Sequence, residues 1–187
     1  MSAFEFVTVL YSLVVAFGVS EILAAFARFL RARVREGTPL FAPLIAALVL
    51  LLQGLLQSLW GYWGYRDSTW SFGGFLIAIL PLLLLSIATS VAIPDPGEAN
   101  RDDSAAHYYG VAPLVYPLVA AWIVFGLVAE LVLVTPSFHA GQGVRLIGVA
   151  VLIVLARIRS DANHLGGLIL LSLLSFAFAE FVTPSLN

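Results

Sequence analysis

The stretch SFGGFLIAILPLLLLSIATSVAI, residues 71–93, decides the fold of this chain. It contains no charged side chain and is continuously apolar, with leucine and isoleucine as its main residues. A membrane-spanning helix needs about 20 mainly apolar residues, and this stretch supplies them. It lacks the alternation of apolar and polar residues that a membrane β-strand would show. The stretch therefore predicts a helix that crosses a lipid bilayer.

Segments of the same character fill nearly all of the 187 residues and leave no room for a soluble domain. The fifth segment is the weakest, because Arg145 and Arg157 stand near its ends and must extend toward the membrane surfaces. The composition agrees, since only 11% of the residues are charged and 61% are hydrophobic. The sequence predicts one all-α, polytopic membrane domain over 1–187, a bundle of six transmembrane helices at 4–30, 40–62, 71–93, 109–134, 141–158 and 165–182.

Arginines are distributed unevenly over the predicted loops, and they account for all nine basic residues. Counting loops by alternation leaves only Arg66 and Arg145 on one side. The other side holds Arg28, Arg31, Arg33, Arg35, Arg101, Arg157 and Arg159. The positive-inside rule makes this second side cytoplasmic, so both termini are expected outside. The acidic start, Met1 to Glu5, differs from the basic start of a cleaved signal peptide, and we expect the first helix to be retained.

Short stretches of similar sequence occur in the two halves of the chain. FGVSE at 17–21 is similar to FGLVAE at 125–130, and residues 73–77 and 166–170 both open with two glycines. These similarities are consistent with a 3+3 inverted repeat, an architecture shared by many small transporters. The cytoplasmic segment 94–108 between the halves is acidic and starts with turn-forming residues, so we expect a solvated hinge loop there.

Polar residues inside the predicted spans are the candidates for a functional site, because such groups are costly in hydrocarbon. Ser20 and Glu21 lie in the first span, and Gln53 and Gln57 stand one turn apart in the second. One interpretation is a polar pathway for a small solute, an ion or a proton. The other is a seam between helices, in which the second span packs on the small residues Ala16, Ser20 and Ala24.

Charged side chains in the spans predict structural ion pairs. Glu21 is expected either to pair with Arg28 or Arg157 or to be protonated, since burial raises the pKa of a carboxyl group. Near the outer surface, Glu130, Arg145 and Glu180 share a depth. The short connection at 135–140 makes the flanking spans neighbours, so we expect Glu130 to pair with Arg145.

Aromatic and histidine residues are expected at the membrane surfaces. Trp60, Trp63 and Trp70 belong to an aromatic cluster typical of an interfacial belt. The three histidines, His107, His139 and His164, fall at the ends of predicted spans, so we expect contact with headgroups and water rather than haem or metal ligation. The chain has no cysteine, which excludes thiol chemistry. We therefore expect no metal and no cofactor.

Function is constrained only broadly by these features. The common hydrolase, protease and nucleotide-binding motifs are absent, so we do not expect an enzyme. A net charge of −2 and short loops argue against nucleic acid as a partner. Two hypotheses remain: a small channel or transporter-like protein, and a non-transporting membrane subunit or scaffold. The second would pack with itself as a homo-oligomer or with a larger membrane protein complex.

Three stretches carry a resemblance to known proteins: residues 14–33, LQGLLQSLW at 52–60, and RIRSDANH at 157–164. In these stretches the chain resembles small six-helix bacterial membrane proteins to which no activity is attached. The resemblance is diffuse and extends over most of the chain. It implies a multi-pass protein of the bacterial inner (plasma) membrane, and it implies no ligand.

Overall fold

The computed structural model describes residues 2–95, 101–134 and 140–181, apart from the side chains of residues 140, 180 and 181. These ranges contain helices and no strand, so the predicted all-α class is confirmed. The short 3-10 helix η1 (Trp63–Tyr65) directly follows the second α-helix. The α-helices are α1 (Ala3–Glu36), α2 (Ala42–Tyr62), α3 (Phe72–Ala92), α4 (Arg101–Leu133), α5 (Ala140–Leu155) and α6 (Asp161–Phe181).

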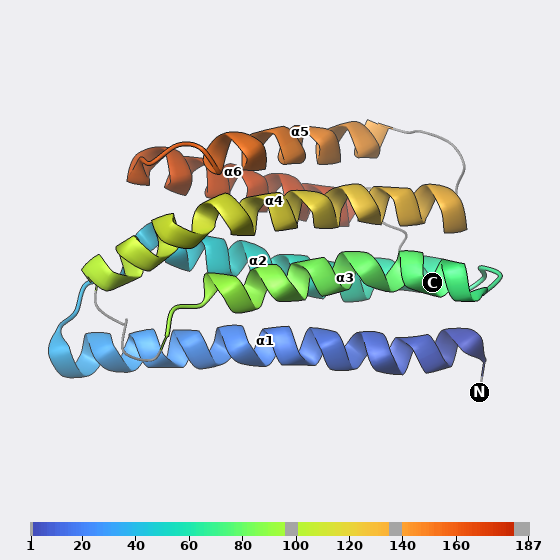
Figure 1. Ribbon diagram of the computed structural model, residues 1–187, viewed down its shortest axis with the longest axis horizontal. Helices are drawn as coiled ribbons and strands as arrows, with labels where there is room; N and C mark the ends of the chain where they lie inside the picture. The colour runs from blue at the N-terminus through green and yellow to red at the C-terminus, as the bar shows by residue number, and fades with distance from the viewer. Residues whose placement is uncertain (1, 96–100, 135–139, 182–187) are drawn as a thin grey trace.

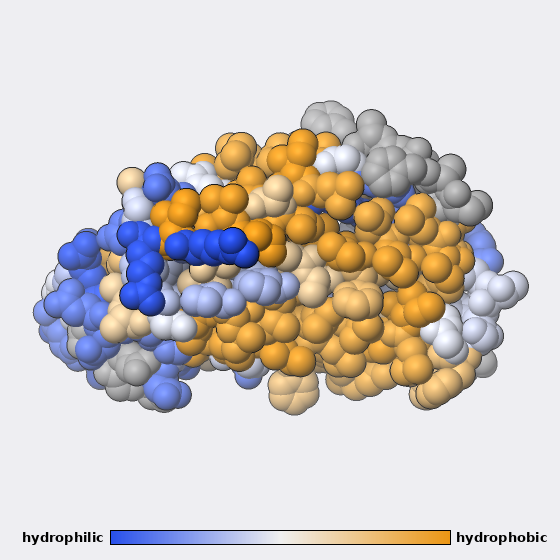
Figure 2. Space-filling model, turned by 45° about the horizontal axis from the view of Figure 1, so that its top comes forward, coloured by the Kyte–Doolittle hydropathy of each residue, from blue (hydrophilic) through white to orange (hydrophobic). Residues whose placement is uncertain are grey.

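Apolar surface covers the flanks of the molecule. Among the described residues, five helical segments are long and apolar enough to cross a membrane, and α5, with 16 residues, is shorter. Large apolar side chains stay exposed along them, such as Phe17 at 74% and Leu173 at 64%. Figure 2 shows this surface as a broad apolar band beside a hydrophilic end. Contiguous apolar surface of this extent suits lipid rather than water, as expected of an integral membrane protein.

Consecutive helices run in opposite directions through the bundle (Figure 1). The first helix, α1, packs on α2 and α3, while α4 packs on α3 and α6 packs on α2. The fifth helix, α5, lies against α4 and α6. One end of the bundle gathers the end of α1, the start of α4 and the α5–α6 connection. We call it the arginine-rich end, because these segments carry Arg28, Arg31, Arg33, Arg35, Arg101, Arg157 and Arg159.

The first helix extends beyond the predicted span 4–30 because both of its ends are capped. The backbone N–H of Glu5 donates to Ser2 Oγ at 3.2 Å, and the N–H of Ser2 donates to Glu5 Oε2 at 2.8 Å. At the other end Gly37 has a left-handed backbone with φ of 67°, and its N–H donates to the Arg33 carbonyl at 3.1 Å. Arginines in the last turn also suit the negative end of the helix dipole.

The fourth helix begins at Arg101, well before the predicted start at residue 109. The expectation of a hinge loop over 94–108 is therefore wrong for residues 101–108, which are helical, and residues 96–100 lie outside the described residues. Asp102 and Asp103 stand in the first turn, where carboxylates stabilise the positive end of the helix dipole. The helix continues through Pro113 and Pro117, and Figure 1 shows a bend in its first half. Each proline removes a backbone hydrogen bond, which accounts for a bend rather than an end.

Contact between α1 and α2 depends on Gly18 rather than on the predicted small-residue face. Ala16, Ser20 and Ala24 are exposed, so the expectation that they pack on the second helix is wrong. Gly18 is buried, and a Cβ atom added there would lie 2.7 Å from Leu55 Cδ1. A side chain at position 18 therefore fits between the two helices only if Leu55 shifts.

Replacing Gly18 with alanine should destabilise the protein. Leu55 is fully buried and has little room to move, so we expect a loss of about 1–2 kcal/mol from overpacking. Gly110→Ala in α4 is the matched control, because a Cβ atom there meets nothing within 4 Å. Better helix propensity should make this control neutral or stabilising. Thermal unfolding of both variants in one detergent checks the difference, and equal midpoints would contradict it.

Candidate functional site

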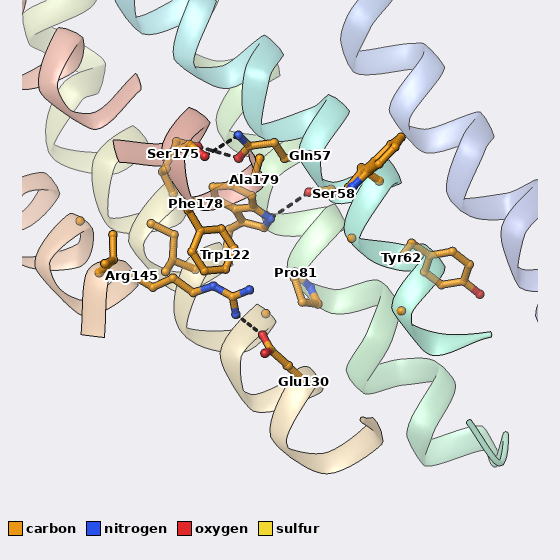
Figure 3. A pocket seen from close by; sticks show the side chains of 18 of the residues that line it. Gln57, Ser58, Tyr62, Pro81, Trp122, Glu130, Arg145, Ser175, Phe178 and Ala179 are labelled. Atoms are coloured by element: carbon orange, nitrogen blue, oxygen red, sulfur yellow. Dashed lines mark hydrogen bonds and ion pairs between the residues drawn. The ribbon is translucent and has the colours of Figure 1, made fainter. Parts of the chain in front are cut away.

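A cavity of about 250 Å³ lies among the helices on the side of the bundle away from the arginine-rich end. Helices α2 to α6 all contribute to its wall, and Tyr11 adds a contact from α1. Figure 3 shows that side chains from α2, α4, α5 and α6 point into this space. The lining residues with a polar side-chain atom are Tyr11, Gln57, Ser58, Trp60, Tyr62, Tyr65, Trp122, Glu130, Arg145 and Ser175.

An ion pair forms one wall of the cavity. Arg145 Nη1 on α5 donates to Glu130 Oε2 on α4, so the structure brings together the two residues expected to pair. The side chains keep 22% and 19% of their surfaces exposed, respectively, so both remain accessible from the cavity. The guanidinium carbon lies 4.3 Å from the centre of the Phe178 ring, a cation–π contact. The third residue of the predicted cluster, Glu180, has its side chain outside the described residues.

The two glutamines of α2 bind α6. Gln53 Nε2 donates to the Ser172 carbonyl at 3.0 Å, and Gln57 Nε2 donates to the Ser175 carbonyl at 2.9 Å. Ser175 Oγ in turn donates to Gln57 Oε1 at 2.6 Å. The predicted seam is therefore formed with the sixth helix and not with the first. Gln57 also lines the cavity, so its amide is at once a packing contact and part of a polar wall.

A further hydrogen bond fixes the aromatic wall of the cavity. Trp122 Nε1 on α4 donates to Ser58 Oγ on α2 at 3.1 Å (Figure 3). The indole ring packs next to Gly54, whose added Cβ atom would lie 3.2 Å from Trp122 Cη2. The glycine thus leaves the space that the ring needs beside α2.

The cavity does not continue to the arginine-rich end. Its deepest lining residues on α2 and α4, Leu50 and Val119, lie near the middle of these helices. Beyond them the bundle is filled by leucines that are at most 3% exposed: Leu44, Leu48, Leu85, Leu155 and Leu168. In this conformation the cavity is therefore a one-sided pocket.

The acidic residue of the first span lies apart from the cavity. Glu21 is exposed at the α1–α3 contact and accepts a hydrogen bond from Ser90 Oγ at 2.8 Å. The structure does not pair it with either predicted arginine: Arg28 donates to the Pro94 carbonyl at 3.5 Å, and Arg157 is exposed in the α5–α6 connection. The four residues predicted to form one polar pathway are thus not brought together, and only Gln57 lines the cavity.

The tryptophans predicted as an interfacial belt lie at the end of the bundle opposite the arginine-rich end. Trp60 and Trp63 are 45% and 43% exposed, and the Trp63 ring faces the Arg66 guanidinium at 5.7 Å. Trp70 is half-buried, and its ring centre lies 6.1 Å from that of Tyr62. Trp60 also belongs to the cavity lining, so part of this aromatic group borders the candidate site.

A buried cluster near the arginine-rich end was not expected from the sequence. His164, in the first turn of α6, is fully buried, so its predicted contact with headgroups and water is wrong. Its Nδ1 atom lies 2.7 Å from the Tyr108 hydroxyl and 3.3 Å from the Tyr116 hydroxyl, and the two hydroxyls also bond each other. Its Nε2 atom lies 2.8 Å from the Ile158 carbonyl.

These contacts define the hydrogen-bonding form of His164. A carbonyl oxygen only accepts, so Nε2 carries the proton and donates to Ile158. Without a proton of its own, Nδ1 can accept from the Tyr108 hydroxyl. Tyr108 and Tyr116 are eight residues apart on α4, about two helical turns, so both hydroxyls can reach one partner on α6. This spacing was the one sequence signal for the cluster.

Comparisons with protein-family models, with curated proteins and with solved structures give no match for this chain. The candidate site is therefore described by its geometry alone: a one-sided cavity whose wall is mainly apolar and aromatic and contains an ion pair and a few hydroxyl and amide groups. Within the described residues no group of three or more histidine or acidic side chains could hold a metal ion.

Proposed function

We propose that this integral membrane protein is a small transporter-like protein that takes up a small solute in the cavity lined by α2 to α6. The observation that carries the proposal is the cavity itself, with the Glu130–Arg145 pair in its mainly apolar wall. Ionisable groups are costly in a membrane and by default mark a functional site. A volume of about 250 Å³ lies just below the roughly 300–1,000 Å³ of sites for drug-sized ligands, which favours a small solute.

The proposed topology has six spans, with the arginine-rich end in the cytoplasm and both termini outside. The unequal distribution of arginines between the two ends supports it. The cavity then lies in the outer half of the membrane, and the packed leucine layer closes its cytoplasmic side. We place the protein in the inner (plasma) membrane of a bacterium, in line with its sequence resemblance. The 3+3 inverted repeat stays a prediction.

A second candidate function is a non-transporting subunit. It is favoured by the hydrogen bonds of Gln53 and Gln57, which join α2 to α6 as structural contacts. In that case the cavity would be a packing defect filled by lipid or by a partner helix. Access of water to the cavity distinguishes the two functions.

Single cysteines test this access, because the chain contains no native cysteine. Gly126→Cys places a thiol at the cavity wall, where an added Cβ atom meets nothing within 4 Å. We expect a membrane-impermeant thiol reagent, added from outside, to label it. Gln53→Cys, at the α2–α6 seam outside the cavity lining, should be protected.

Two exposed positions serve as topology controls. Asp67→Cys, at the end of the bundle opposite the arginine-rich end, should label from outside, and Asn163→Cys, at the start of α6, only after the membrane is opened. Labelling of Asp67→Cys with full protection of Gly126→Cys would contradict an aqueous cavity and favour the subunit. Outside labelling of Asn163→Cys would contradict the proposed orientation.

A further inference from the structure

We propose that the cavity binds a small zwitterion, a solute with one carboxylate and one ammonium group, between Arg145 and Glu130. This inference rests on the proposed solute cavity and names its substrate class. Arg145 and Glu130 carry opposite charges and lie side by side on the wall of one pocket.

The two charged groups offer complementary contacts to such a solute. A guanidinium has five N–H donors in one plane, and the bond to Glu130 is made from Nη1. A carboxylate can bind such a fork through two parallel hydrogen bonds. The Glu130 carboxylate attracts an ammonium group by its opposite charge, also where methyl groups replace the N–H donors. A solute with both groups therefore matches the order of charges along the wall.

Charge balance disfavours ions of a single sign. The described lining holds one cation and one anion, Arg145 and Glu130, so this part of the wall has no net charge. A lone anion or a lone cation would bring an unbalanced charge into a region of low dielectric, which is costly. A zwitterion adds no net charge, and each of its groups faces an opposite one.

Aromatic rings next to the pair favour an ammonium group that carries methyl groups. The Phe178 ring already accepts the Arg145 guanidinium on its face at 4.3 Å. Trp122 and Tyr65 add further rings to the same wall. Such rings attract cations, and weakly hydrated methylated ammonium groups suit them best.

Calorimetric titration of the purified full chain in detergent tests the inference with three probes of similar shape. Glycine betaine carries both charges, 3,3-dimethylbutyrate keeps the carboxylate but lacks the positive charge, and choline keeps the ammonium but lacks the carboxylate. We expect saturable binding of glycine betaine and at least about tenfold weaker binding of the other two, because each of them lacks one of the two opposite-charge contacts. No binding of glycine betaine, or equal binding of either analogue, would overturn the inference.

Variants connect the binding to the cavity. Glu130→Gln and Arg145→Gln should each weaken binding of glycine betaine by at least about tenfold. If either variant fails to fold, binding of glycine betaine to Gly126→Phe tests the inference. This substitution fills the cavity from a position with free space and leaves the ion pair in place. Gly110→Ala, near the other end of α4, should bind normally. Unchanged binding in Gly126→Phe would overturn the inference.

Uptake of glycine betaine into proteoliposomes separates this inference from the proposed function. Binding without uptake supports the zwitterion site and contradicts transport. In a different result, the protein takes up another polar solute, Gly126→Phe blocks this uptake, and glycine betaine does not bind. That result supports transport and overturns the zwitterion site.

Discussion

Glu130→Leu should destabilise the protein more than any other single change considered for the bundle. It leaves the Arg145 guanidinium in the wall of the cavity without the carboxylate that it binds. Breaking a fully buried pair costs roughly 3–5 kcal/mol, and about a fifth of each side chain is exposed here, so we expect about 3 kcal/mol. Thermal unfolding in detergent, or unfolding by increasing SDS, measures the loss.

The matched control for this prediction is the double variant Glu130→Leu with Arg145→Met. It removes both charges and replaces them with apolar side chains of similar length, which is often neutral for a buried pair. We expect it to recover most of the stability lost in the single variant. A double variant as unstable as Glu130→Leu would show that the charge pair is not the cause of the loss.

His164→Leu should have the second largest effect on stability. Leucine fills much of the volume of the imidazole ring, but it can neither donate to the Ile158 carbonyl nor accept from the Tyr108 hydroxyl. Each buried polar group without a partner costs roughly 1–3 kcal/mol, so we expect a total loss of about 2–3 kcal/mol. The cluster joins α4 to the start of α6, so the loss should include the contact between these helices.

Two variants make this prediction specific. His164→Gln should lose less than His164→Leu, because an amide has both a donor and an acceptor. Tyr109→Phe should be nearly neutral, because its hydroxyl bonds the exposed Asp161 carboxylate at 2.6 Å at the surface of the protein. Unfolding midpoints in one detergent allow the comparison. Equal losses in Tyr109→Phe and His164→Leu would contradict a special role of the buried cluster.

The one-sided cavity sets a requirement for transport. A solute bound beside Glu130 and Arg145 meets the packed leucine layer on its way to the arginine-rich end. Transport therefore requires a second conformation in which this layer opens, as in alternating access. A channel, in contrast, would need a continuous path, and this conformation has none along the described cavity.

Several parts of the site follow from sequence features that act locally. The pairing of Glu130 with Arg145 follows from a short connection between two spans, which places both residues at one depth. The bend of α4 near Pro113 and Pro117 follows from the missing backbone donors. The burial of His164 could not be predicted from the sequence, because a position near a helix end does not reveal whether neighbouring tyrosines cover that end.

The sequence by itself determined the helical class, the membrane environment and the segregation of the arginines, because these follow from run length and composition. Only the tertiary structure decided that Gln53 and Gln57 face α6, that Ala16, Ser20 and Ala24 are exposed, and that the cavity closes halfway. The physical reason is that these helices are apolar on all sides. Lipid and protein are similarly apolar neighbours for leucine and valine, so helical periodicity does not mark which face packs inside.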